Sequence, residues 1–68
     1  MKHMDVHVDT LACEASEADV VDGLLAAQGV LAASADFRSE HVAVSYDPSR
    51  VDEGALWDHL KFFGLTAA

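Results

Sequence analysis

The sequence predicts an α+β domain in which two helices pack on one face of a four-stranded antiparallel sheet. Three observations predict it. Ser16 and Asp19 have the spacing of a helix capping box, Asp52 is a favourable N-cap for a second helix, and alternating apolar and polar residues flank both helices. A chain of 68 residues makes one domain, with a thin core and marginal stability.

The first half of the chain predicts a strand, a helix and a weaker strand. In residues 4–9, Met and Val alternate with Asp and His, which is typical of a strand with one buried face. Apolar residues at helical spacing follow the cap at Ser16, and Gly29 is expected to end that helix. Residues 30–37 indicate a second strand, which is weaker because it is rich in alanine.

The second half repeats this order with a shorter final strand. Residues 42–46 alternate strictly and give the clearest strand pattern in the chain, which Pro48 interrupts. A helix is expected to begin after Asp52 and to end at Gly64. Residues 65–68 leave room for only a short last strand.

This element order predicts a ferredoxin-like βαββαβ sandwich: a four-stranded antiparallel sheet with strand order 4-1-3-2 and both helices on one face. In that topology the loop with Cys13, the turn at residues 38–40 and the loop at residues 63–65 lie at the same end. The domain is expected to span residues 4–68. Residues 1–3 are interpreted as a tag remnant or a disordered start.

Composition excludes several classes of partner. Twelve acidic residues oppose four Lys and Arg, a formal net charge of −8, so neither nucleic acid nor an anionic membrane is an expected partner. No apolar run reaches the length of a membrane span, and a signal peptide is not expected because Asp5, His7 and Asp9 interrupt the first apolar stretch. The lone Cys13 favours a reducing, cytoplasmic location.

The acidic excess also suggests a halophilic protein. Asp exceeds Glu, Lys is scarce, and small Ala and Val fill the apolar positions. High ionic strength screens the repulsion among such carboxylates. The alternative is an ordinary acidic protein.

Four short motifs follow one another at characteristic spacings: Cys13-Glu14-Ala15-Ser16 after the first strand, then Gly29-Val30, Tyr46-Asp47-Pro48 and Gly64-Leu65. Together they resemble the heavy-metal-associated domain family, which includes copper chaperones. The resemblance covers residues 4–68 and implies the fold predicted above. It also implies a site for Cu(I) or another soft metal in the loop after the first strand, where the family carries a CxxC motif.

The chain departs from this family pattern at the site itself. Its motif is degenerated to CxxS, because Ser16 stands in place of the second cysteine. The resemblance therefore implies only Cys13 as a metal ligand. A neutral hydroxyl is a poor ligand for Cu(I), so Ser16 marks the motif position and is expected to serve as an N-cap. Leu11 stands where the family has Met and is expected to anchor the loop from below, while Leu65 replaces a Tyr.

Two functions remain open. The first is soft-metal binding or trafficking through Cys13, with a second thiolate from another copy of the chain or from a protein partner. The alternative is a metal-free protein-binding or regulatory module, for which Phe62 is expected to add to an exposed apolar spot near Cys13. A redox thiol ranks below both because no basic residue lies near Cys13 in the sequence. An enzyme is not expected, since the chain has no glycine-rich phosphate loop and little room for a pocket.

Histidines suggest a second, weaker site. His3 and His7 share a predicted strand face with Asp5 and Asp9, and the strand order predicts that Asp9 lies near His41 on the uncovered face of the sheet. This arrangement would make an ion pair or a weak site for a hard metal. The alternative, which is favoured because isolated surface ion pairs contribute little to stability, is a set of solvated histidines.

Overall fold

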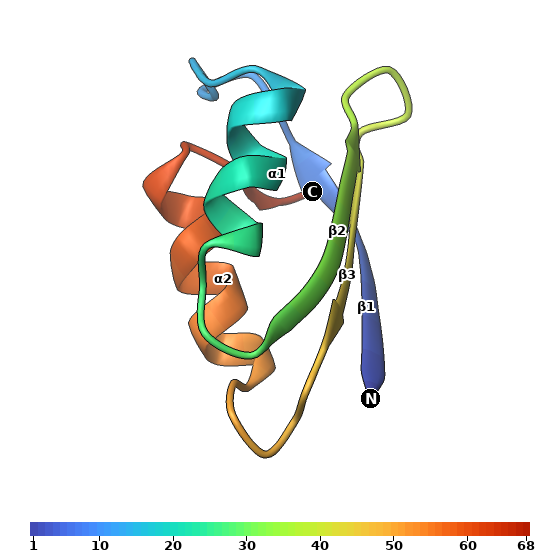
Figure 1. The fold of residues 1–68 in the computed structure, drawn as a ribbon. Coiled ribbons are helices and arrows are strands. Elements are labelled where there is room, and N and C mark those ends of the chain that lie inside the picture. The colour runs from blue at the N-terminus through green and yellow to red at the C-terminus, as the bar shows by residue number, and fades with distance from the viewer.

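Strands and helices alternate along the chain in the predicted order. The computed structural model describes residues 1–68. The elements are β1 (Lys2–Asp9), α1 (Glu17–Leu25), β2 (Val30–Asp36), β3 (His41–Tyr46), α2 (Glu53–Phe62) and β4 (Thr66–Ala67). The antiparallel sheet has the order β2-β3-β1-β4, and both helices lie on one of its faces (Figure 1). The predicted ferredoxin-like sandwich is confirmed.

Both helices begin at the caps that the sequence predicts. Ser16 Oγ accepts a hydrogen bond from Asp19 N at 3.1 Å, and the Asp19 carboxylate accepts one from Ser16 N at 3.4 Å, which completes the capping box. Asp52 Oδ1 accepts one from Ala55 N at 2.8 Å. These bonds satisfy N–H groups that a helix leaves without an internal partner.

Three boundaries differ from the sequence-based prediction. β1 begins at Lys2, which pairs with Tyr46, so this strand takes in residues that were predicted to lie before the domain. Phe37 lies outside β2, because the Asp36 carboxylate accepts a hydrogen bond from Arg38 N and starts the turn there. α1 ends at Leu25, before the expected stop at the glycine of residue 29.

The core lies between the sheet and the two helices. No polar or charged side chain is buried. The ten buried hydrophobic side chains are those of Met4, Val8, Val20, Leu24, Val42, Val44, Tyr46, Leu56, Leu60 and Leu65. Val6 was expected among them but is only half-buried, because the short β4 pairs only with the last two residues of β1. Neither helix has the length or apolar composition that crossing a bilayer requires.

Tyr46 joins the end of β3 to the second helix. Its ring is buried, and its hydroxyl donates a hydrogen bond to Glu53 Oε1 at 3.3 Å. Burial raises the pKa of Tyr46, and the negative charge of Glu53 raises it further. The phenol therefore stays neutral and keeps its donor role over the physiological pH range.

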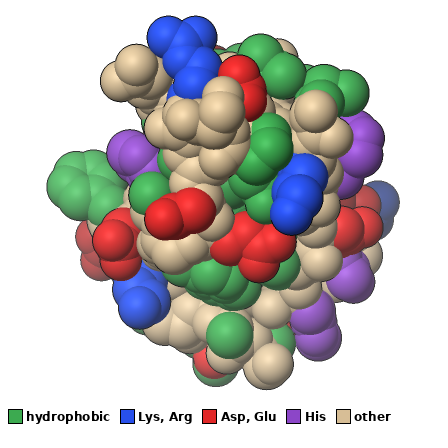
Figure 2. All heavy atoms as spheres, turned by 90° about the horizontal axis from the view of Figure 1, so that it is seen from below, with side chains coloured by type: hydrophobic (Ala, Val, Ile, Leu, Met, Phe, Trp, Pro, Cys, Tyr) green, Lys and Arg blue, Asp and Glu red, His purple; other side chains and the backbone are tan.

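The acidic side chains are dispersed across the face of the molecule that Figure 2 shows. Seen from the end of the molecule where the chain starts, they occur at several places across the face, among apolar and basic groups (Figure 2). The structure contains one close ion-pair contact, between His41 and Asp5. Lys and Arg side chains therefore do not neutralise the carboxylates by direct pairing. Only water and dissolved ions screen the repulsion among the carboxylates.

We expect the melting temperature to rise between low and molar KCl, because salt screens this self-repulsion. Each 1 kcal/mol of relieved repulsion should raise it by about 4–8 °C in a domain of this size. Thermal melts followed by circular dichroism measure the effect. A variant with both Asp22→Asn and Asp58→Asn, two exposed positions, carries less negative charge. Its melting temperature should depend less on the salt concentration. An equal or higher melting temperature at low salt would contradict the halophilic interpretation.

Candidate metal-binding site

The loop between β1 and α1 is shaped by its own hydrogen bonds. Asp9 Oδ1 accepts a bond from Leu11 N at 2.9 Å, and Cys13 N donates to Thr10 O at 3.1 Å. Ser16 then begins the helix as its N-cap. Two successive turns thus present Cys13 three residues before Ser16, the N-cap of α1.

Cys13 is a free thiol at the boundary between core and solvent. Its side chain is half-buried and packs against the hydrophobic core. The Sγ–H group donates to Ala15 O at 3.5 Å, and a thiol is a weak donor. A metal ion that replaced the thiol proton would therefore break only the weak hydrogen bond to Ala15 O.

Gly64, between α2 and β4, holds the Cys13 loop against the second helix. Its φ of +88° lies in the left-handed region that glycine adopts readily. A Cβ atom at this position would collide with the carbonyl oxygen of Ala12 and lie 3.2 Å from the Cα of Cys13. The two backbones can approach this closely only because residue 64 has no side chain.

The turn between β2 and β3 completes the same end of the molecule. Phe37 N donates to Glu17 Oε2 at 2.7 Å, which links the turn to the start of α1. Val8 N donates to Glu40 O at 2.7 Å and links it to β1. The predicted meeting of the three loops is confirmed, and Figure 1 shows two of them, after β1 and after β2, at the upper end.

The role predicted for Leu11 is wrong. Its side chain is 94% exposed, because the turn closed by the Asp9 carboxylate directs it away from the core. Leu11 therefore does not anchor the loop from below. Leu65, by contrast, is fully buried at this end.

An apolar spot does lie near Cys13, as predicted. Phe62 is 86% exposed and packs edge-to-face on Phe63 with 5.4 Å between the ring centroids. Phe62 borders a shallow hollow whose lining includes both the second helix and the Cys13 loop: Ala12, Glu14, Ala15, Lys61, Phe62, Phe63 and Gly64. Exposed aromatic surface of this kind is typical of protein contacts.

The loop supplies one soft ligand and no more. Ser16 Oγ is engaged in the helix cap, and its hydroxyl does not replace a thiolate. No three His, Cys, Asp or Glu side chains come together anywhere in the chain in a way that could hold a metal ion. Within one chain, Cys13 is therefore the single thiol available to a soft metal.

The sequence profile of the heavy-metal-associated domain matches residues 5–58. The chain belongs to this family. Among solved structures, a CopZ metallochaperone superposes with a TM-score of 0.85 at 22% identity, over 98% of this chain and 100% of that one. A copper-binding domain from HMA7, a P-type ATPase, gives 0.85 at 26% identity, over 100% and 92%. A copper form of CopA from Bacillus subtilis gives 0.77 at 27%, over 98% and 88%. No curated protein matches the chain.

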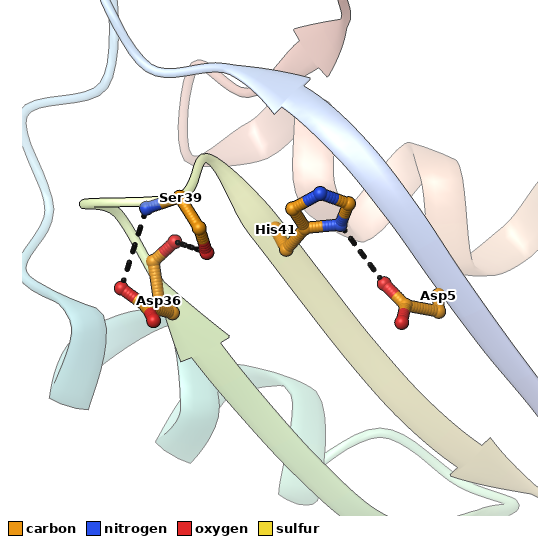
Figure 3. Close-up of polar contacts among 4 residues, drawn as sticks. All are labelled: Asp5, Asp36, Ser39 and His41. Atoms are coloured by element: carbon orange, nitrogen blue, oxygen red, sulfur yellow. Dashed lines mark hydrogen bonds and ion pairs between the residues drawn. The ribbon is translucent and has the colours of Figure 1, made fainter.

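In this heavy-metal-associated domain the histidine contact differs from the one predicted. His41 Nδ1 lies 3.1 Å from Asp5 Oδ1 (Figure 3), and it is Asp5 rather than Asp9 that His41 contacts by a hydrogen bond. The register pairs His41 with His7, so Asp5 and Asp9 are both diagonal neighbours of His41. Asp9 is unavailable because its carboxylate bonds the backbone of the loop that follows β1. Strand alternation predicts that His41, Asp5 and Asp9 share one face of the sheet, but it does not predict which of the two carboxylates His41 contacts.

Proposed function

We propose that this domain binds Cu(I) or a similar soft metal through Cys13 and serves in metal trafficking. The observation that carries the proposal is a free, half-exposed cysteine in the loop between β1 and α1, in a chain of this family. Two of the similar structures, at 26% and 27% identity, are described as copper-bound or copper-binding. Its role is to hold and pass on a metal rather than to catalyse a reaction, in a reducing compartment such as the cytoplasm.

We further propose that tight binding takes its second thiolate from outside the chain. Soft thiolate ligands select Cu(I), and this chain has one cysteine. A second copy could contribute its own Cys13, or a cysteine-bearing protein partner could complete the site. Leu11 and Phe62 are exposed at this end and provide apolar surface for such a contact.

The test is a Cu(I) titration under anaerobic, reducing conditions, with native mass spectrometry to count metals and chains. We expect complexes of one metal and two chains, because each chain supplies one thiolate. Cys13→Ala should abolish uptake and leave the circular dichroism spectrum unchanged. Binding by Cys13→Ala equal to that of the wild type would contradict the proposal.

A second candidate function follows from the exposed apolar side chains. Leu11 and Phe62 are 94% and 86% exposed at the Cys13 end, an arrangement that also suits a metal-free protein-binding module. The same titration separates the two functions. The absence of Cu(I) uptake at any stoichiometry would favour the metal-free module.

A further inference from the structure

Two histidines stand side by side on the face of the sheet that the helices leave open. His7 on β1 is directly opposite His41 on β3, and their side chains point away from the core. The imidazole rings stack with 5.2 Å between their centroids and 20° between their planes. Directly opposed side chains on antiparallel strands are close enough to share one small ligand.

We propose that His7 and His41 form a two-imidazole site for a borderline divalent cation such as Zn²⁺, separate from the Cys13 loop. Imidazole nitrogen suits Zn²⁺, whereas Cu(I) prefers thiolate, so the two places would select different metals. The protein would contribute two ligands, and water molecules would complete the coordination. This proposal does not depend on the function proposed for Cys13.

Asp5 orients one of the two ligands. A carboxylate only accepts hydrogen bonds, so His41 Nδ1, 3.1 Å from Asp5 Oδ1, carries the proton. The remaining nitrogen, Nε2, then has a free lone pair. A histidine that donates one N–H to a carboxylate and binds metal with the other nitrogen is the usual arrangement at zinc sites.

The charge of this face also favours a cation. Asp36 on β2 stands directly opposite His41, and Asp9 follows His7 on the same face of β1. Both carboxylates accept backbone hydrogen bonds, from Arg38 N and Leu11 N, so they add negative charge rather than ligands (Figure 3 shows Asp36 turned toward the loop). The carboxylates would attract a divalent cation to the imidazole pair.

Only side chains need to move for both nitrogens to reach one ion. The His41 side chain is 50% exposed, and His7 is exposed as well. Exposed side chains change rotamer within nanoseconds, so the stacked rings can tilt until both Nε2 atoms face the same point. The paired backbones of β1 and β3 hold the two Cα atoms in place during this change.

The experiment is a Zn²⁺ titration of the Cys13→Ala chain, followed by the imidazole nitrogen resonances in NMR and by the melting temperature. Removing the thiol ensures that Zn²⁺ bound by cysteine does not contribute. We expect His7→Gln and His41→Gln each to weaken binding by more than about tenfold, because loss of a ligand should cost more than loss of a group that only orients one. Asp5→Asn should weaken it by roughly tenfold, because His41 loses its orienting carboxylate.

Two matched variants serve as controls. His3→Gln removes a histidine on the same strand face, roughly 13 Å along the strand from His7, and His59→Gln removes one on α2. Both should bind Zn²⁺ as the parent chain does. Equal losses in the controls, or full binding by His41→Gln, would overturn the proposal.

Discussion

Replacing Ser16 with Cys is expected to give a domain that binds one Cu(I) per chain, roughly 10²–10⁴-fold more tightly than the wild type. The second thiolate would then belong to the same loop as Cys13. A ligand on the same chain has an effective concentration in the millimolar range or above, whereas a second chain in a dilute solution is present at micromolar concentration. Competition with a Cu(I) chelator of known affinity measures the gain, and native mass spectrometry gives the stoichiometry.

The same substitution should weaken the helix that follows the loop. Ser16 Oγ accepts the bond from Asp19 N, and losing such a cap costs about 1 kcal/mol. Ser49→Cys is the matched control, since it adds a thiol in the loop between β3 and α2, at the opposite end of the molecule (Figure 1). If Ser16→Cys still bound one metal per two chains, or if Ser49→Cys bound as tightly, Cys13 would not be the ligand in the form proposed.

Gly64→Ala is expected to lower the free energy of unfolding by about 1–3 kcal/mol through its left-handed backbone alone. The collision of the new Cβ with the Ala12 carbonyl adds to this loss and displaces the loop that carries Cys13. Urea unfolding followed by circular dichroism measures the stability. We also expect weaker Cu(I) binding, because the displaced loop no longer holds Cys13 in place.

Gly54→Ala is the matched control for this prediction. Gly54 lies in the first turn of α2, its φ is not positive, and the nearest atom to an added Cβ is Asp52 Oδ1 at 3.4 Å. Alanine is favoured over glycine in a helix by roughly 0.5–1 kcal/mol, so the variant should be as stable as the wild type or more stable. A Gly64→Ala chain as stable as Gly54→Ala would show that the backbone contact at the Cys13 loop is not required.

The regular elements were predictable because their signals are local. A capping box needs only Ser16 and Asp19 at the correct spacing, and strand alternation in residues 42–46 needs only neighbours along the chain. The element order then restricts the topology to few solutions, so the strand order followed as well. Cys13 was found as a candidate ligand from its motif, and the structure places it in the predicted loop.

The exposure of Leu11 and the partner of His41 could not be predicted in this way. Leu11 is apolar, but the hydrogen bond that its backbone N–H donates to the Asp9 carboxylate closes a turn that directs the side chain into solvent. That same bond engages the Asp9 carboxylate, and Asp5 is the hydrogen-bond partner of His41. Both outcomes depend on which group binds the Asp9 carboxylate, the backbone N–H of Leu11 or the ring of His41. The alternation of apolar and polar residues does not predict this choice.

By itself, the sequence determined the two capped helices, the buried faces of the strands and the single thiol that limits what the loop can bind. Only the tertiary structure decided which side chains meet. It placed Gly64 against the Cys13 loop and set the register that stacks His7 on His41. The physical reason is that caps and alternation depend on neighbours in the chain, whereas these contacts join residues more than thirty positions apart, brought together by burial of one shared core.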